Sequence, residues 1–445
     1  MKSKRFSKVS LIALVLLLIG TSVTVFSKEK KQDSAPVTIK IWGAIQEDQG
    51  PAELISNFMK ANPHIKVEYV FYKNDPAGNT KLSTALMAGD DVDLFINYGA
   101  RRIDPRAKGG QALDLTPYIT KDRFNMKDNF GTDYYTTDGK VFALPASTLK
   151  TTVWINKQAL DEAGLPLPKK DWTWEDYKEY AKKLTKGEGA NKRYGSIWYD
   201  PGYSFTTPAR GLLGTNCFYK ADGNSNFDHP AYKMSLKYKL ELENQLKVQE
   251  NRIEFIMAKL NYWSEFFTGK AAMMIGSDAM LRHALNQKDY PRTWKVAFAN
   301  LPRYDKSSKE NYMGRTYFDY IAISKNSKNK DAAWKLAKYW STQGSLYMFK
   351  FGRASAWKKT DIGKISDLII SESNQKLFDV PSFKKVFLDF TSPGYNDNDF
   401  TAYAQIDQII TEEYEKAQLG SITVDQALEN MKKRSDKEIA KERGK

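Results

Sequence analysis

Short alternating strands and amphipathic helices follow one another along the first hundred residues of the chain. Segments 37–42 and 65–72 alternate β-branched and polar residues, a pattern typical of strands. Between them, 52–60 carries its apolar residues on one helical face. A helix over 80–88 and a strand over 92–96 extend the series. This β-α-β-α-β succession predicts a doubly wound α/β lobe.

The same alternation continues after residue 140, which favours α/β architecture for the whole chain. One long helical region, 232–267, is expected to contain a break, because an uninterrupted helix of that length is unusual in a globular domain. The further strands are predicted over 141–145, 151–155, 194–197, 271–275, 295–299 and 320–323, and the further helices over 156–163, 173–184, 278–286, 332–340, 402–417 and 424–439.

The N-terminus has the layout of a secretory signal peptide. Basic residues occupy four of the first eight positions, and 9–26 is free of charge. We expect cleavage near Ser27, which leaves a charged leader up to residue 35. Retention as a membrane anchor is the alternative, because about 18 apolar residues is the lower limit for spanning a bilayer. Thr21 stands where a lipoprotein signal carries its lipidated Cys, so a lipid anchor is disfavoured. These features predict an extracellular or envelope-associated protein.

Length and composition exclude several classes of protein. A chain of 445 residues is too long for one compact domain, and 41% hydrophobic with 27% charged residues excludes a fibrous or wholly disordered chain. The single Cys217 and only three His exclude a Cys/His zinc site, and we expect neither a metal nor another cofactor. The net charge of +15 falls to 15 − 4 = +11 when residues 1–27 are removed.

Several sequence strings, in a fixed order, resemble the extracellular solute-binding proteins of bacterial ABC importers, in particular the sugar-binding family of maltose-binding protein. The resemblance runs from about residue 37 to residue 434. Its clearest carriers are VTIKIWG at 37–43, ALMAGDDVDLF at 85–95, GGQALDLTPYI at 109–119, TTVWINKQALDEAGL at 151–165 and FFTGKAAMMIGSDAM at 266–280.

This resemblance implies a periplasmic-binding-protein-like fold of type II, with two doubly wound lobes, a ligand cleft and a hinge. It further implies a monomer that binds a carbohydrate and docks on the membrane subunits of an ABC permease, without catalysis or nucleic acid. The chain should cross between lobes near 146–151, 299–303 and 344–354. The expected parts are a signal peptide at 1–27, a leader at 28–35, an N-terminal lobe of 36–147 and 298–348, and a C-terminal lobe of 148–297 and 349–445.

Aromatic and polar side chains at strand ends are the first candidates for ligand contacts. Aromatic rings can cover the apolar faces of a sugar, while polar groups satisfy its hydroxyls, which are costly to bury unpaired. Core packing is the alternative for Trp42, a helix-dipole role for Glu47 and Asp48, and a solvated surface position for Arg101. Adjacent side chains of a strand point to opposite sides, so only one of Trp198 and Tyr199 should face the cleft. The candidates are Trp42, Glu47, Asp48, Asn97, Tyr98, Arg101, Trp198 and Tyr199.

A second set of candidates follows later turns. Relatives often carry a stacking aromatic in the turn after the strand over 271–275, where this chain has Asp278, so a hydroxyl or amine contact is expected instead. The polar loop 392–400 is expected either to close over ligand or only to cap a helix. The candidates are Ser277, Asp278, Arg315, Tyr317, Asp319, Tyr395 and Asn396.

Three other interpretations stay open or are disfavoured. Carboxylates beside aromatics also describe glycoside hydrolases, but no catalytic pair can be placed, and the sequence has no GxSxG, P-loop or HExxH motif. The basic charge lacks a nucleic-acid-binding motif and accompanies an export signal. It is either a solvated Lys-rich surface, an adaptation to anionic envelope polymers, or the sign of an acidic ligand such as a uronic-acid oligosaccharide. In the last case Arg101, Arg102 and Arg315 would be its partners.

Overall fold

The computed structural model describes residues 36–89, 91–198, 202, 204–308, 312 and 314–444. The predicted signal peptide and leader, and the candidate Tyr199, lie outside these residues. Within the described part of the chain, no helix combines the length and the apolar character needed to cross a membrane.

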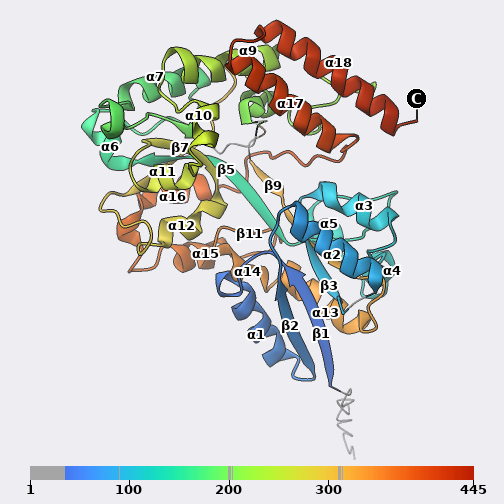
Figure 1. Cartoon of the computed structure of the whole chain (residues 1–445). Coiled ribbons are helices and arrows are strands. Elements are labelled where there is room, and N and C mark those ends of the chain that lie inside the picture. The colour runs from blue at the N-terminus through green and yellow to red at the C-terminus, as the bar shows by residue number, and fades with distance from the viewer. Residues whose placement is uncertain are drawn as a thin grey trace, which may run out of the picture. The chain divides into compact units, whose positions relative to one another are not determined.

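The first β-sheet confirms the series of elements predicted for the first hundred residues (Figure 1). Its first strand β1 pairs in parallel with β2 and β3, and the later strand β10 pairs antiparallel with β3 and β4. Helices α1 (Pro51–Ala61) and α2 (Pro76–Ala88) connect the three parallel strands. The strand order is β2 (Ile65–Phe71), β1 (Val37–Gly43), β3 (Leu94–Tyr98), β10 (Asp319–Ile323) and β4 (Leu144–Pro145).

The second sheet is built around the long strand β5 (Ser147–Asn156). β5 pairs antiparallel with β7, β8, β9 and β11, and β7 pairs in parallel with β6. Trp154 of β5 is fully buried, with its ring centroid 4.9 Å from that of Phe298, so it is a core residue. The other strands are β6 (Ile197–Trp198), β7 (Met273–Ser277), β8 (Val296–Asn300), β9 (Arg315–Tyr317) and β11 (Ala354–Ser355).

Helix boundaries follow local capping signals. The Thr173 side chain caps α7 (Trp174–Leu184) in a capping box with Asp176, and Thr423 caps α18 (Val424–Glu442) in the same way. The expected break in the long helical region is present. That region divides into α9 (Pro230–Leu240), a π-helical turn (Glu241–Gln245), α10 (Arg252–Met257) and α11 (Tyr262–Phe267). The remaining α-helices are α3 (Ile103–Lys108), α4 (Thr116–Lys121), α5 (Met126–Phe130), α6 (Lys157–Glu162), α8 (Thr207–Leu213), α12 (Leu281–Leu285), α13 (Lys330–Ser341), α14 (Ser345–Phe349), α15 (Ile362–Ile369), α16 (Val380–Phe387) and α17 (Tyr403–Gln418).

The chain passes from one sheet to the other three times. It does so at Ala146, at Phe318, and between α14 and β11. The first two crossings are hydrogen-bonded to each other, because the Ala146 N–H donates to the Asp319 carbonyl (2.8 Å) and the Phe318 N–H donates to the Ser147 carbonyl (2.9 Å).

The second crossing differs from the expected position near 299–303. After β8, which pairs with β5, the chain returns through β9 to pair with β5 again. Residues 298–300 of β8 and the whole of β9, which we expected in the N-terminal lobe, therefore lie in the second sheet. The sequence predicted β8 but not β9, and it could not specify which sheet either strand joins.

Candidate functional site

A cavity of about 480 Å³ borders both sheets. This volume is in the range that binds small ligands. On the side of the first sheet, the cavity is lined by Asn74, which follows β2, and by Phe318 at the second crossing. On the side of the second sheet, it is lined by residues of β5, β7 and β9. Two predicted site residues, Ser277 and Tyr395, line it directly. The other lining residues are Leu149, Thr151, Ser204, Thr206, Thr207, Arg210, Tyr262, Trp263, Ile275, Gly276, Ala279, Met280, Arg282, Gly314, Thr316 and Arg353.

The aromatic part of the cavity wall is held rigidly. Trp263 of α11 stacks on His283 with ring centroids 4.9 Å apart, and its Nε1–H donates to the Tyr290 hydroxyl (3.1 Å). Tyr395 lies against the Arg210 guanidinium, 4.4 Å from the ring centroid. Rings that are fixed in this way can present a flat apolar face to a ligand with little loss of side-chain entropy.

Three arginines line the cavity, and their partners differ. Arg210 forms an ion pair of 2.8 Å with Asp397. Arg353 lies 3.5 Å from Asp319 and stacks its guanidinium over Phe318. The third, Arg282, has no ion pair with any described carboxylate.

The Arg282 side chain is half-buried on α12. Its Nε–H donates to His283 Nε2 (3.1 Å), and its terminal nitrogens have no partner in the described part of the chain. Burial and the charge of Arg353 lower the pKa of Arg282. Burial and the charge of Arg282 lower the pKa of His283 to about 4, so this imidazole is neutral and can accept the hydrogen bond.

Behind the cavity wall lies a layer of buried ion pairs. The Asp278 carboxylate binds Arg315 Nη1 (2.5 Å) and accepts the Lys150 N–H (3.2 Å), while Arg315 Nη2 donates to the Phe387 carbonyl (2.6 Å). Lys150 Nζ lies 3.7 Å from Asp389. Asp278 and Arg315, both predicted as ligand contacts, are thus bound to the protein itself and do not line the cavity. Burial raises the pKa of Asp278, although Arg315 opposes this shift.

A glycine brings the third crossing close to this layer. Gly352 has φ of +82°, and a Cβ at this position would lie 2.0 Å from the Asp278 carbonyl oxygen. Only glycine meets both conditions without strain. The close approach places the next residue, Arg353, at the cavity and beside Asp319, a predicted ligand contact that is buried at the second crossing. The Asp319 carboxylate also accepts a hydrogen bond from the Ser147 hydroxyl (2.7 Å).

The candidates at the strand ends of the first sheet do not line this cavity. Trp42 is half-buried with the Lys81 ammonium 5.6 Å from its ring, and Glu47 and Asp48 are exposed in a 3-10 turn. Asn97 is buried and accepts a hydrogen bond from Arg106, and the Tyr98 hydroxyl accepts the Ala44 N–H (2.6 Å). The side-chain oxygens of Asn97 and Tyr98 therefore contact the protein.

Two further candidates lie apart from the cavity. Arg101 stacks on Tyr403 (5.3 Å) and, with Arg102, lines a different groove, between α2, α3 and α17. Trp198 is buried in the second-sheet core, 5.2 Å from Trp174 between ring centroids, where it packs and does not face a ligand.

The polar loop before α17 joins the two sides of the molecule. The Tyr317 N–H donates to Asn396 Oδ1 (2.8 Å), and Asn396 Nδ2 donates to Asp133 (2.8 Å). Tyr317 itself donates its hydroxyl to the Phe130 carbonyl. Both candidates thus connect β9 to the region around α5, at the margin of the cavity.

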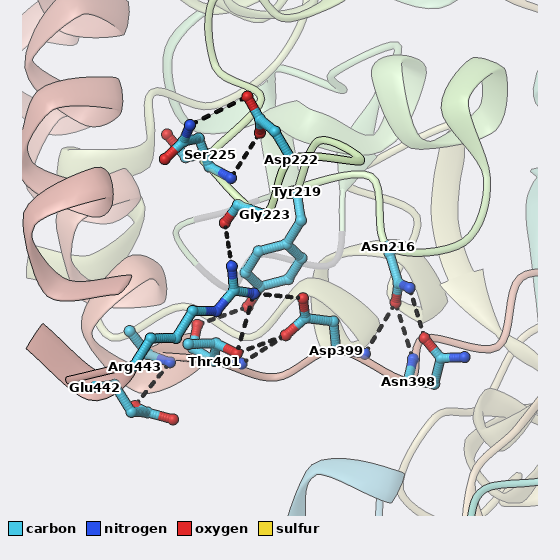
Figure 2. Close-up of polar contacts among 12 residues, drawn as sticks. Asn216, Tyr219, Asp222, Gly223, Ser225, Asn398, Asp399, Thr401, Glu442 and Arg443 are labelled. Atoms are coloured by element: carbon cyan, nitrogen blue, oxygen red, sulfur yellow. Dashed lines mark hydrogen bonds and ion pairs between the residues drawn. The ribbon is translucent and has the colours of Figure 1, made fainter. Parts of the chain in front are cut away.

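Figure 2 shows how the end of this loop is fixed. Asn216 Nδ2 donates to Asn398 (2.6 Å), Arg443 at the end of α18 binds Asp399 (3.0 Å), and the Ala402 N–H donates to Glu442 (2.8 Å). These contacts anchor the loop to the second-sheet side and so keep Tyr395 at the cavity.

Sequence reasoning missed the arginines and Trp263 for identifiable reasons. Arg353 lies within the predicted third crossing, in the string FGRAS. A charged residue at a crossing could have been chosen as a candidate from the sequence. Arg282 belongs to a predicted helix that follows a strand, but its missing partner is a property of the folded chain. Trp263 was concealed in the long helical region, whose break points fix the face on which it lies.

A family model described as bacterial extracellular solute-binding protein matches residues 42–345. A protein of Brucella abortus named as a binding protein is 26% identical over 337 residues, covering 73% of this chain and 75% of that protein. The maltotriose-binding protein of Pyrococcus abyssi is 25% identical over 311 residues, covering 68% and 62%.

Solved structures show the same fold. A sugar transporter of Rhizobium etli in an open conformation aligns with a TM-score of 0.72 at 20% identity, covering 89% of this chain and 98% of that one. An ABC substrate-binding protein of Listeria monocytogenes in complex with cycloalternan also gives 0.72, at 22% identity, covering 92% and 99%. These alignments confirm the α/β fold class predicted from the sequence.

Proposed function

This chain belongs to the family of bacterial extracellular solute-binding proteins, and we propose that it captures an oligosaccharide in the cavity between its sheets and delivers it to an ABC permease. It acts as a monomer, exported by the signal segment 1–27. The relatives that bind maltotriose or cycloalternan support a sugar ligand.

The observation that carries the proposal is the composition of the cavity wall. Rigid rings of Tyr262, Trp263, Phe318 and Tyr395 stand among hydroxyl and arginine side chains. Rings match the apolar faces of a sugar, and hydrogen-bonding groups match its rim of hydroxyls. Ser277 and Thr151 are the proposed hydroxyl partners.

The same wall argues for binding without reaction. A glycoside hydrolase needs two carboxyl groups on either side of the scissile bond. Among the described residues that line the cavity there is no Asp or Glu. The nearby Asp278, Asp319 and Asp397 are each paired with an arginine.

Delivery to a permease requires that the ligand-bound protein differ in conformation from the free protein. The three crossings form the hinge about which the two sheets would close on the ligand. Ligand shifts this equilibrium only through contacts that are better in the closed form. We propose that Asn74 and Phe318 make those contacts from the first sheet's side.

The test is isothermal titration calorimetry of the purified mature chain against neutral and acidic oligosaccharides, with a thermal-unfolding screen in parallel. A ligand at 100 times its Kd should stabilise the folded state by about 2.7 kcal/mol. Chromatography of the same mixtures should return the sugar unchanged. Release of shorter saccharides would establish a hydrolase, and a response to peptides or polyamines alone would exclude carbohydrate as the ligand.

A further inference from the structure

Among the described residues, the arginines that line the cavity and the cations Arg315 and Lys150 behind it form ion pairs, with one exception. Four cations each have a carboxylate partner within 4 Å. The exception is Arg282, which has no carboxylate partner among the described residues. The pairs are Arg210–Asp397, Arg315–Asp278, Arg353–Asp319 and Lys150–Asp389.

Burying a cation without a counter-charge is costly, and an anionic ligand would reduce that cost. Arg282 lines the cavity beside Arg353, which increases the local positive potential. Burial and, to a smaller extent, the charge of Arg353 lower the pKa of Arg282. The terminal nitrogens of Arg282 have no partner in the described part of the chain, although its Nε is fixed by His283. The guanidinium is therefore oriented and has its hydrogen-bond donors free.

The aromatic surface and the free guanidinium are mechanically connected. His283 both stacks on Trp263 and accepts the Arg282 hydrogen bond. The ring that would cover a sugar face and the group that would bind a negative charge are thus held on one rigid unit, formed by α11 and α12.

We propose that the ligand is an acidic saccharide, whose oxyanion binds Arg282 and Arg353 while its ring packs against Trp263. The inference rests on the proposed function and specifies the class of sugar. A guanidinium binds carboxylate or phosphate oxygens through paired, charge-assisted hydrogen bonds, so both uronic acids and sugar phosphates share the required chemistry. Arg101, Arg102 and Arg315, the arginines expected from the sequence, are not the ones involved.

The experiment is calorimetry with matched probes that differ only in charge. Trigalacturonate and triguluronate are each compared with their full methyl esters, and glucose 6-phosphate is compared with glucose. We expect one acidic member to bind about 10- to 100-fold more tightly than its neutral match. The acidic member that binds distinguishes a carboxylate ligand from a phosphate ester.

The Arg282→Gln variant should reduce this preference to less than about threefold, because the acidic probe loses more affinity than its neutral match. Arg282→Lys, which keeps the charge, should retain part of it. Arg101→Gln, in the separate groove, is the matched control and should behave as the wild type. Thermal unfolding of each variant establishes that it is folded.

The outcomes separate the two proposals. Tight binding of neutral oligosaccharides without preference for the acidic forms would overturn this inference and leave the proposed function standing. A preference that survives in Arg282→Gln would also overturn it. Failure of every saccharide, acidic and neutral, to bind would overturn both.

Discussion

Arg282 in the cavity wall and Arg315 in the layer behind it have opposite surroundings. Arg315 is bound by Asp278 and the Phe387 carbonyl and lies 4.4 Å from the Phe390 ring centroid. Arg282 has a neutral histidine and a second arginine as its neighbours. The residue type is the same, and the presence of a carboxylate on another element decides whether the charge serves the fold or a ligand.

The largest expected effect is a loss of stability when the Arg315–Asp278 ion pair is broken. Asp278→Asn keeps an acceptor for the Lys150 N–H but leaves Arg315 buried without a carboxylate. Breaking a buried pair in this way costs about 3–5 kcal/mol. Urea denaturation should show a decrease in the free energy of unfolding of this size. The exposed control Asp48→Asn should change it by less than about 0.5 kcal/mol.

Equal stability of Asp278→Asn and the wild type would contradict the structural role assigned to the pair. The variant's folded fraction should retain its affinity for saccharide, because Asp278 does not line the cavity. A selective loss of affinity would restore Asp278 as a ligand contact.

The next effect concerns the aromatic side of the cavity wall. Trp263→Ala removes the ring that stacks on His283, and truncation of a central aromatic anchor costs about 2 kcal/mol, or roughly 30-fold in Kd. Calorimetry with the best saccharide measures it. Trp294→Ala is the matched control, since Trp294 packs on Phe266 in the same core without lining the cavity. Equal affinity losses in both variants would indicate a general packing defect.

Arg353 both lines the cavity and forms an ion pair with Asp319. A conservative substitution can separate its role in binding from its role in stability. Arg353→Lys keeps a positive charge for Asp319 but removes the planar fork that binds an oxyanion at two points. We expect roughly tenfold weaker binding of the acidic saccharide, with stability changed by less than about 1 kcal/mol. A larger loss of stability than of binding energy would assign Arg353 to the ion-pair layer.

Sequence reasoning succeeded where the signal was local. The strand β1 and the helix α7 are defined by their own alternation, apolar face and capping residues, and their predicted boundaries are within one residue of the structure. It failed for segment 298–317, because the choice of sheet depends on pairing with β5, more than a hundred residues away.

In the candidate site, contacts between residues far apart in the chain were even harder to predict from the sequence. Asp278 and Arg315 were predicted as ligand contacts, and nothing in the sequence around either residue indicates that they bind each other instead. Arg282 is informative because no carboxylate of the described residues reaches it, and such a property exists only in the folded chain. Ser277 and Tyr395 line the cavity, and each was a candidate on a local signal: Ser277 ends β7, and Tyr395 lies in the polar loop before α17.

The smallest expected effect is a change in the pH dependence of stability, which comes from the titration of Lys150 in the layer of ion pairs behind the cavity wall. Burial lowers the pKa of Lys150 to about 8 from its ordinary value of 10.5, although Asp389 opposes the shift. Between about pH 8 and pH 10 the unfolded chain holds a proton that the folded chain has released, so this group makes the free energy of unfolding increase with pH. The slope is about 1 kcal/mol per pH unit, because a whole proton gives about 1.4.

Lys150→Met should remove this contribution. Urea denaturation at several pH values in that window gives the difference between wild type and variant, which cancels the titration of the buried tyrosines common to both. Asp389 keeps hydrogen bonds from Ser392 and Thr391 in the variant. The exposed control Lys140→Met should preserve the wild-type slope. A difference between wild type and Lys150→Met that is constant with pH would mean that Lys150 stays charged, and that the layer behind the cavity wall is as polar as the wall itself.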